Sequence, residues 1–251
     1  MTLALAARAK LNLDLAVVGR RGDGLHELRS RMQSIDLHDL LEVAPAEKTS
    51  LSLTGMVISP SGGNTVLAAQ AALQEAAGRD LPAAFLLHKR IPAGSGFGGA
   101  SSDAAAALRA LVTMHCLDVD LREIAPRVGA DVGFFLVGGA ALIEGAGERV
   151  TPIAGGPAWF ALAWPGIELS TAAVYSAWDE VKGDGANQLR RAAGHVDKRV
   201  DEFAAALGPG WQMTGSGSAF FRVCANRKEA VAATADLECW TAVSQAVDAW
   251  A

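Results

Sequence analysis

The sequence is poor in the residues that build disulfide frameworks, metal clusters and nucleic-acid surfaces. Only three cysteines occur in 251 residues, at Cys116, Cys224 and Cys239. Three scattered cysteines exclude a disulfide framework and a cysteine-rich metal site, so we expect buried thiols in a reducing compartment. Basic residues form no long run and the net charge is -5. A nucleic-acid partner is therefore not expected.

Long apolar runs are also lacking. The longest uncharged apolar stretch, residues 132–143, is followed by Glu144, well short of the roughly 20 residues that span a bilayer. Arg8 and Lys10 interrupt the apolar N-terminus, which argues against a secretory leader. About half of the residues are hydrophobic (51%), enough for a sizeable core. We expect a cytoplasmic protein without membrane contact, a monomer or weak dimer.

Strand and helix patterns mingle along the chain without a strict βαβ rhythm. Residues 10–18 alternate like a half-buried strand, with Lys10 and Asn12 opposite the leucines. A helix is expected between Asn64, a natural N-cap, and Gly78. Further strands are expected at 37–46, 49–55, 83–92, 132–145, 148–153, 159–166 and 219–223, and further helices at 103–112, 120–129, 170–181, 197–207 and 226–238. The mixture predicts an α+β fold, with lobes at 1–153 and 154–251 joined by a glycine-rich hinge.

Residues 94–102, "GSGFGGASS", have glycine at five of nine positions. The dinucleotide fingerprint G-x-G-x-x-G fits the letters, but it belongs at the first βα turn of a sheet, with an acidic residue ending the next strand. Asp118 and Asp120 have the right distance but a loop-like context. A Walker loop needs lysine where this chain has Ala100, and the H-R-D and D-F-G motifs of protein kinases are missing. An NAD(P) oxidoreductase stays as a minor alternative.

The glycine-rich segment nevertheless has the features of a phosphate site. Bare backbone N–H groups and a helix dipole meet where the glycines join the alanine-rich helix. Ser101 and Ser102 are expected to cap that helix and to offer hydroxyls to a phosphate or its Mg²⁺. An ordinary serine-capped helix would explain the serines but not the five glycines, so the pattern favours phosphate binding.

Three segments in order resemble the motifs of the GHMP kinases, the superfamily of galactokinase, homoserine kinase, mevalonate kinase and phosphomevalonate kinase. They are residues 9–28, residues 89–108 with the pattern P-x-x-x-G-x-G-G-x-S-S-x-A, and residues 214–221, "TGSGSAFF". Within the superfamily, residues 32–43, 129–153 and 164–178 are most similar to the 4-diphosphocytidyl-2-C-methyl-D-erythritol kinases of the non-mevalonate isoprenoid pathway. The resemblance covers most of the chain.

That resemblance implies a two-lobed fold, with an N-terminal lobe like ribosomal protein S5 domain 2 and a ferredoxin-like C-terminal lobe. It also implies transfer of the γ-phosphate of ATP, with Mg²⁺, to the 2-hydroxyl of the cytidine-diphosphate polyol. Lys10 and Asp131 fall on the catalytic positions. The implied ATP-binding residues are Asn64, Lys89, Pro92, Gly94, Ser95, Gly96, Gly98, Gly99, Ala100, Ser101 and Ser102. The implied substrate-binding residues are Asn12, Leu25, His26, Thr171 and Tyr175.

The residue types agree with this chemistry but leave alternatives open. Phosphoryl transfer needs in-line positioning, charge neutralisation and an oriented hydroxyl. Asp131 precedes an apolar run, where a carboxylate can accept a proton or simply end a turn. Lys10 would be a solvated strand lysine unless it faces the phosphate loop, where it could also keep Asp131 ionised. Leu25 stands where the family has tyrosine, so a GHMP kinase for another small alcohol remains an alternative, as does a catalytically silent relative.

Overall fold

The structure, a computed structural model, describes residues 1–56 and 63–248. The chain forms two compact units whose segments interleave along the sequence. Unit 1 comprises Met1–Ala9, His38–Ala93 and Gly98–Val137, and unit 2 comprises Lys10–Leu37, Gly94–Phe97 and Gly138–Ala251. Two long strands, β1 (Leu3–Asn12) and β3 (His26–Pro45), contribute residues to both units. The lobe boundary at residue 153 stays a prediction.

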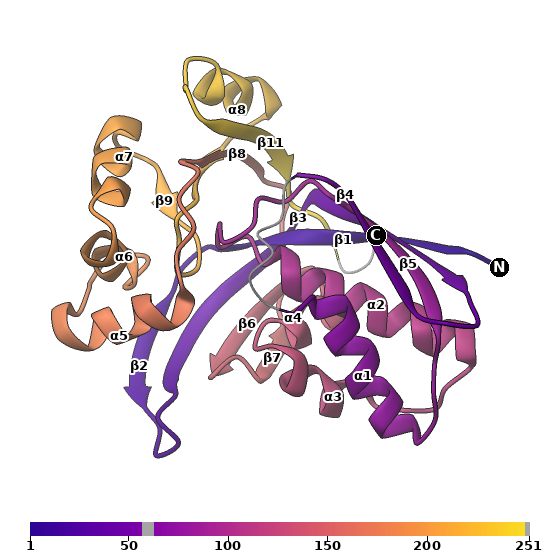
Figure 1. Ribbon diagram of the computed structural model, residues 1–251. Coiled ribbons are helices and arrows are strands. Elements are labelled where there is room, and N and C mark those ends of the chain that lie inside the picture. Colours follow the sequence, from indigo (N-terminus) through magenta and orange to yellow (C-terminus); the bar gives the residue numbers. More distant parts are fainter. Residues whose placement is uncertain (57–62, 249–251) are drawn as a thin grey trace. The chain divides into compact units, whose positions relative to one another are not determined.

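Unit 1 packs helices against strands. Its further elements are β4 (Ser50–Gly55), α1 (Thr65–Ala77), β5 (Ala83–Lys89), α2 (Gly99–His115), α3 (Leu121–Val128) and α4 (Val132–Val137). Strand β5 runs antiparallel to β3 and parallel to β4. Figure 1 shows α1 to α4 gathered on one side of these strands. Leu81, Ala83, Phe85 and Leu87 are buried beneath them, so the alternating side chains of β5 supply this core.

Helices α1 and α2 follow from local sequence. The Asn64 side chain caps α1 by accepting a hydrogen bond from Val66 N, and Gly78 ends the helix in the left-handed conformation, as predicted. Helix α2 has a run of buried residues from Ser102 to Leu108. Small alanine side chains allow neighbouring helices to approach α2 closely on several sides, which makes it the central helix of the unit.

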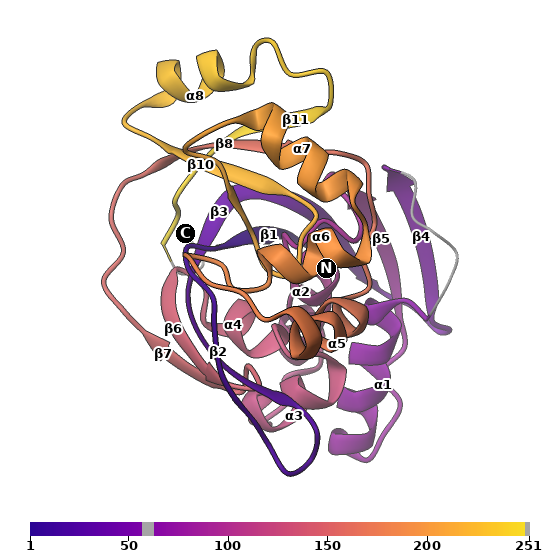
Figure 2. The same cartoon turned by 90° about the vertical axis from the view of Figure 1, so that its left-hand side faces the viewer.

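The described residues of unit 2 form two groups of strands and four helices. Its further elements are β2 (Ala16–Arg20), β6 (Ala140–Gly145), β7 (Arg149–Pro152), β8 (Trp159–Trp164), α5 (Thr171–Val181), α6 (Arg190–Val196), α7 (Arg199–Leu207), β9 (Gln212–Met213), β10 (Phe220–Cys224), α8 (Arg227–Thr234) and β11 (Trp240–Gln245). The first part of β3 pairs antiparallel with β2 and β6, and β6 pairs with β7. An antiparallel sheet has the order β11-β8-β10-β9, and α8 lies along it (Figure 2).

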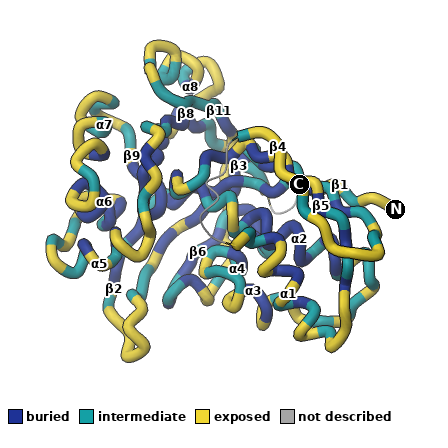
Figure 3. The backbone as a smooth tube through the Cα atoms, in the orientation of Figure 1, coloured by how far each residue is buried: buried dark blue, intermediate teal, exposed yellow. Residues whose placement is uncertain are grey.

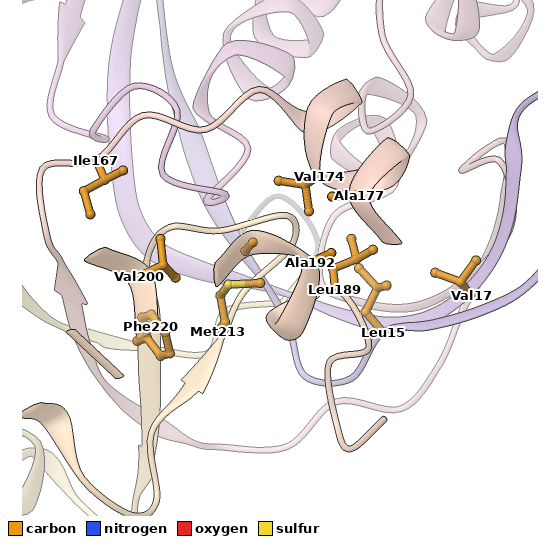
Figure 4. Packing of buried hydrophobic residues seen from close by; sticks show 11 residues of the cluster. Leu15, Val17, Ile167, Val174, Ala177, Leu189, Ala192, Val200, Met213 and Phe220 are labelled. Carbon is orange, nitrogen blue, oxygen red and sulfur yellow. The ribbon is translucent and has the colours of Figure 1, made fainter. Parts of the chain in front are cut away.

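The main core of unit 2 lies where α5, α6 and α7 meet β9 and β10. Figure 4 shows Val174 of α5, Leu189 beside α6, Val200 of α7 and Phe220 of β10 contributing to it. Each of these side chains is at most 2% exposed. Burial of each of these four side chains stabilises the fold by about 1.5–3 kcal/mol. This shared core holds α5 and the turn before β10 together. The burial pattern along both units is drawn in Figure 3.

The α+β prediction is confirmed, and several local predictions were wrong. Residues 132–137 form a helix rather than a strand, because an apolar run without periodicity does not distinguish the two. Strand β1 is buried on both faces near its end, so the half-buried interpretation of residues 10–18 was wrong. Helix α6 was not predicted, and Cys116 is exposed rather than buried. Among the described residues, no helix is long and apolar enough to cross a membrane.

Candidate functional site

The first part of the glycine-rich loop packs against the turn that follows β9. Gly96 has φ +89°, and a Cβ placed on it would lie 2.4 Å from the carbonyl oxygen of Thr214. Ala219 N donates to the carbonyl of Ser95 at 2.9 Å. The backbones of residues 94–97 and 214–219 therefore touch without room for a side chain at Gly96. The glycine-rich segment "TGSGSAFF" therefore packs closely against the loop within unit 2.

Lys10 and Asn12 are anchored at this same contact. Lys10 N donates to the carbonyl of Phe97 at 2.9 Å, and Lys10 Nζ donates to Asn12 Oδ1 at 2.5 Å. Asn12 N donates to Thr214 Oγ1 at 3.0 Å, and a Cβ on Gly215 would lie 3.1 Å from Lys10 Nζ. Lys10 is only 3% exposed. An ammonium group is thus held beside the glycine loop rather than in solvent.

Ser30 and the backbone fix the orientation of Asn12. Its Nδ2 donates to Ser30 Oγ at 2.7 Å, and Ser30 Oγ in turn donates to the carbonyl of Asp14 at 2.6 Å. Because Nδ2 has this acceptor, Oδ1 faces the ammonium of Lys10. Asn12 therefore positions Lys10 as well as being a predicted substrate residue. Neither Ser30 nor Thr214 was among the predicted site residues.

The second part of the loop begins α2 in unit 1. Gly98, at φ +77°, is the N-cap and supplies no side chain, and the helix starts at Gly99. Ser101 and Ser102 lie inside the first turn, so the prediction that they cap the helix was wrong. The first N–H groups of an α-helix have no partner within it. Those of Gly99, Ala100 and Ser101 form the bare N-terminus that an anion can contact.

Two flanking segments of unit 1 lie against this helix start. Thr65 Oγ1, next to the N-cap Asn64, donates to the carbonyl of Ala100 at 2.7 Å. A Cβ on Gly129 would lie 3.5 Å from Ser101 Oγ. Asp131, two residues further on, immediately precedes α4 and is partly exposed. The structure thus brings the turn of Asp131 and the cap of α1 to the first turn of α2.

Strand β5 ends at Lys89, and the buried Pro92 lies three residues further along the chain. Lys89 Nζ donates to Asp103 Oδ2 at 2.6 Å and also contacts Asp39 Oδ2. A Cβ on Gly99 would lie 3.3 Å from Lys89 Nζ. Neither aspartate was predicted, because they lie 50 and 14 residues from Lys89 in sequence and no local pattern connects such positions.

A second group of predicted residues meets in unit 2, around the start of β3 and the helix α5. The His26 ring stacks on Tyr175 with a centroid distance of 5.1 Å and an interplanar angle of 27°. His26 Nε2 lies 2.8 Å from Asp179 Oδ1. The hydrogen bond from His26 lowers the pKa of Asp179. Asp179 was not predicted, although its i+4 spacing from Tyr175 places both on one helix face.

Of the other predicted substrate residues, Thr171 lies on the same helix as Tyr175, whereas Leu25 lies on an exposed hairpin. Thr171, the first residue of α5, has its Oγ1 3.0 Å from Ser216 Oγ in the glycine-rich turn. Leu25, on the hairpin before His26, is 54% exposed. The hydrogen bond between Thr171 and Ser216 therefore links the start of α5 to the segment that packs on the glycine loop, whereas Leu25 presents an open aliphatic surface.

Metal-binding side chains do not cluster in the described part of the chain, where no group of three His, Cys, Asp or Glu residues could hold an ion. The hydroxyl groups of Ser101 and Ser102 are oxygen donors of the kind that Mg²⁺ accepts.

Comparisons with known proteins identify the family to which this chain belongs. Residues 64–139 match the family model described as the GHMP kinases N terminal domain, which includes the glycine loop and α2. A curated relative from Geobacter sp. (strain M21), named 4-diphosphocytidyl-2-C-methyl-D-erythritol kinase, is 35% identical over 94% of this chain and 94% of its own length. The chain belongs to the family of 4-diphosphocytidyl-2-C-methyl-D-erythritol kinases.

Two further similarities support the assignment. A relative of the same name from Deinococcus radiodurans is 43% identical over 74% of this chain, and the match spans 64% of that relative. A crystal structure of 4-(cytidine 5'-diphospho)-2C-methyl-D-erythritol kinase is 34% identical, with a TM-score of 0.82, and the match covers 97% of this chain and 99% of that one. The predicted family is confirmed, and the oxidoreductase alternative is wrong.

Proposed function

We propose that this protein transfers the γ-phosphoryl group of ATP to the 2-hydroxyl of 4-diphosphocytidyl-2-C-methyl-D-erythritol. The observation that carries the proposal is the ammonium of Lys10, buried beside a glycine loop whose second half begins a helix. The loop has alanine at the position of a Walker lysine, so positive charge must come from elsewhere. Family membership supplies the acceptor, a cytidine-diphosphate polyol. A cytoplasmic location and a monomeric or weakly dimeric state remain predictions.

Phosphate binding is assigned to the loop and to the start of α2. The N–H groups of Gly99, Ala100 and Ser101 would bind phosphate oxygens, helped by the helix dipole. Gly94, Ser95, Gly96 and Gly98 would shape the loop, while Asn64, Lys89 and Pro92 would support it from α1 and β5. The hydroxyl of Ser101 or Ser102 would hold Mg²⁺, which neutralises phosphate charge when bound.

Two residues are assigned to the chemical step. Asp131 would accept the proton of the attacking 2-hydroxyl or orient that hydroxyl for in-line attack. Lys10 would stabilise the negative charge that develops on the transferring phosphoryl group, since its ammonium is desolvated and pre-positioned by Asn12. Both assignments agree with a reaction in which positioning and electrostatics supply most of the catalysis.

Recognition of the substrate is assigned to the group around His26. Tyr175 and His26 present stacked rings to which a nucleobase face could be added. Thr171 and Asn12 would contact the polyol and diphosphate. Leu25 would cover the base with an aliphatic rather than an aromatic surface, which gives a weaker stacking contribution.

The proposed activity is tested by ATP turnover with three alcohols: 4-diphosphocytidyl-2-C-methyl-D-erythritol, homoserine and mevalonate. We expect kcat/KM for the first to exceed the others by orders of magnitude. Equal or greater kcat/KM for homoserine or mevalonate would favour a GHMP kinase for another alcohol. No ADP release with any alcohol, together with intact ATP binding, would favour a catalytically silent relative.

The catalytic assignments are tested by Lys10→Ala and Asp131→Asn. Each is expected to lower kcat by at least two orders of magnitude while changing ATP affinity severalfold at most. Lys10→Arg should not restore turnover, because a planar guanidinium cannot replace a compact ammonium at a packed site. Near wild-type kcat in either of the first two variants would refute that residue's role.

A further inference from the structure

A buried asparagine of unit 2 lies outside the set of predicted site residues. Asn187 belongs to the polar connection, residues 182–189, between α5 and α6. It is only 6% exposed. A polar side chain is seldom buried unless its polar atoms are hydrogen-bonded, so the partners of Asn187 indicate what it does.

The side chain of Asn187 ties this connection to the turn after β9. Its Nδ2 donates to the carbonyl of Met213 at 2.8 Å and to the carbonyl of Gly215 at 2.9 Å. Its Oδ1 accepts from Leu189 N at 2.9 Å. Both donors of the amide are used, and the bond to Oδ1 fixes which way the amide faces. One side chain therefore binds the carbonyls on both sides of Thr214.

The backbone around Asn187 is held by the chain that follows β1. Leu15 N donates to the carbonyl of Ala186 at 2.8 Å, and Gln188 N donates to the carbonyl of Leu15 at 2.9 Å. These two main-chain bonds flank Asn187 and fix the point from which its side chain extends. Asn187 is thus anchored to the same stretch of chain that carries Lys10.

The turn that Asn187 holds rests on Lys10. A Cβ on Gly215 would lie 3.1 Å from Lys10 Nζ and 3.2 Å from the carbonyl oxygen of Gly96. Such short distances leave no room for a side chain, so Gly215 contacts the ammonium and the glycine loop at once. A shift of Gly215 would therefore move the surface against which the ammonium of Lys10 is held.

We propose that Asn187 is a positioning residue that fixes Gly215 against Lys10 and thereby sets where the ammonium meets the transferring phosphoryl group. The inference rests on the proposed function, because it assumes that Lys10 acts in the chemical step. Loss of both Nδ2 donors would leave the buried carbonyls of Met213 and Gly215 without these partners, and the turn would move to satisfy them. A displacement of about 1 Å near the reacting groups can lower the rate about a hundredfold.

Two variants separate the donor groups of Asn187 from its acceptor. Asn187→Ala removes all three hydrogen bonds. Asn187→Asp keeps an oxygen for Leu189 N, but its second oxygen, when ionised, donates nothing to the carbonyls of Met213 and Gly215. Both variants should lower kcat for the cytidine-diphosphate polyol about ten- to hundredfold.

The KM values distinguish positioning from disruption of the substrate sites. Ala219 N donates to the carbonyl of Ser95 independently of Asn187, so the glycine loop stays joined to the turn. KM for ATP and for the polyol should remain within about threefold of wild type. Ser244→Ala is a matched control, because Ser244 is also buried in unit 2 and accepts from Leu37 N at 3.2 Å. It should lower the urea midpoint and leave kcat within about twofold.

A double-mutant cycle with Lys10 tests whether Asn187 acts through the ammonium. The kcat values of Lys10→Ala and of the Lys10→Ala, Asn187→Ala double variant should agree within about threefold, because the group that Asn187 positions is already missing. Losses that multiply would overturn the inference. Near wild-type kcat in Asn187→Ala, or an equal loss of kcat in Ser244→Ala, would overturn it as well.

Hydrogen exchange tests the tie independently of turnover. Thr214 N donates to the carbonyl of Ala219, and Gly217 N donates to the carbonyl of Thr214. Both amides should exchange about tenfold faster in Asn187→Ala, with the amides of α8 unchanged. Unchanged or uniformly faster exchange would contradict the positioning role. If wild-type protein transfers no phosphoryl group to the polyol, the proposed function fails by itself, and exchange at the turn still decides whether Asn187 holds it.

Discussion

Replacement of Gly96 by alanine tests the contact on which the site in unit 2 depends. The residue has φ +89°, and the added Cβ would lie 2.4 Å from the Thr214 carbonyl oxygen, a backbone atom that cannot rotate away. The left-handed conformation costs about 1–2 kcal/mol for an L-residue. The forced backbone shift adds about 1–3 kcal/mol, as in other overpacked interiors. We expect Gly96→Ala to lower the free energy of unfolding by about 2–5 kcal/mol.

Variants at two other glycines measure the cost of the left-handed conformation apart from the cost of the backbone contact. Gly24 has nearly the same dihedral, φ +87°, but an added Cβ would meet nothing within 4 Å. Gly24→Ala should therefore lose only about 1 kcal/mol, because part of the strain is offset by the reduced entropy of the unfolded chain. Gly22 also has open space around it and no left-handed φ, so Gly22→Ala should change stability by less than about 0.5 kcal/mol.

Urea denaturation of the three variants provides the measurement, followed by ATP turnover for those that remain folded. Gly96→Ala should also raise the KM for ATP at least tenfold, because the loop can no longer rest on residues 214–217. Losses that agree within about 0.5 kcal/mol for Gly96→Ala and Gly24→Ala would refute the close backbone contact. An unchanged KM for ATP would refute its importance for the loop.

Three further outcomes follow from the structure. Tyr175→Ala should raise the KM for the cytidine substrate at least tenfold with little change for ATP; equal effects on both would indicate core packing. Asn64→Ala should lower the free energy of unfolding by about 1 kcal/mol through loss of the α1 cap, and no change in urea denaturation would contradict the cap. Since the pKa of Asp103 is raised in the folded state, wild-type stability should fall by a few kcal/mol as pH rises from about 4 to 8. Urea midpoints should show this fall reduced in Asp103→Asn, whereas an unchanged slope would refute a neutral buried Asp103.

Features set by neighbouring residues could be predicted from the sequence. The cap at Asn64 and the left-handed Gly78 follow from local backbone chemistry, so α1 was placed correctly. The start of α2 was misplaced because Gly98, not a serine, takes the N-cap position. Residues 132–137 were misassigned since an apolar run suits a buried helix as well as a strand.

Features that join distant parts of the chain could not be predicted. Asp179 lies 153 residues from His26, and Asp39 lies 50 residues from Lys89. Charge and spacing give no information about such pairs, because only the fold brings them together. The family resemblance did place His26, Tyr175 and Lys10 in a site, but it did not identify the aspartates and hydroxyl groups that hold them.

We propose that the protein phosphorylates the 2-hydroxyl of 4-diphosphocytidyl-2-C-methyl-D-erythritol with ATP. Phosphorus NMR of the purified product, after incubation with ATP and Mg²⁺, tests it most directly. We expect one new phosphomonoester resonance, coupled to the carbon that bears the 2-hydroxyl, with the diphosphate bridge intact and one ADP formed per product. ADP formed without a phosphomonoester, or a phosphomonoester at a different hydroxyl, would contradict the proposed function.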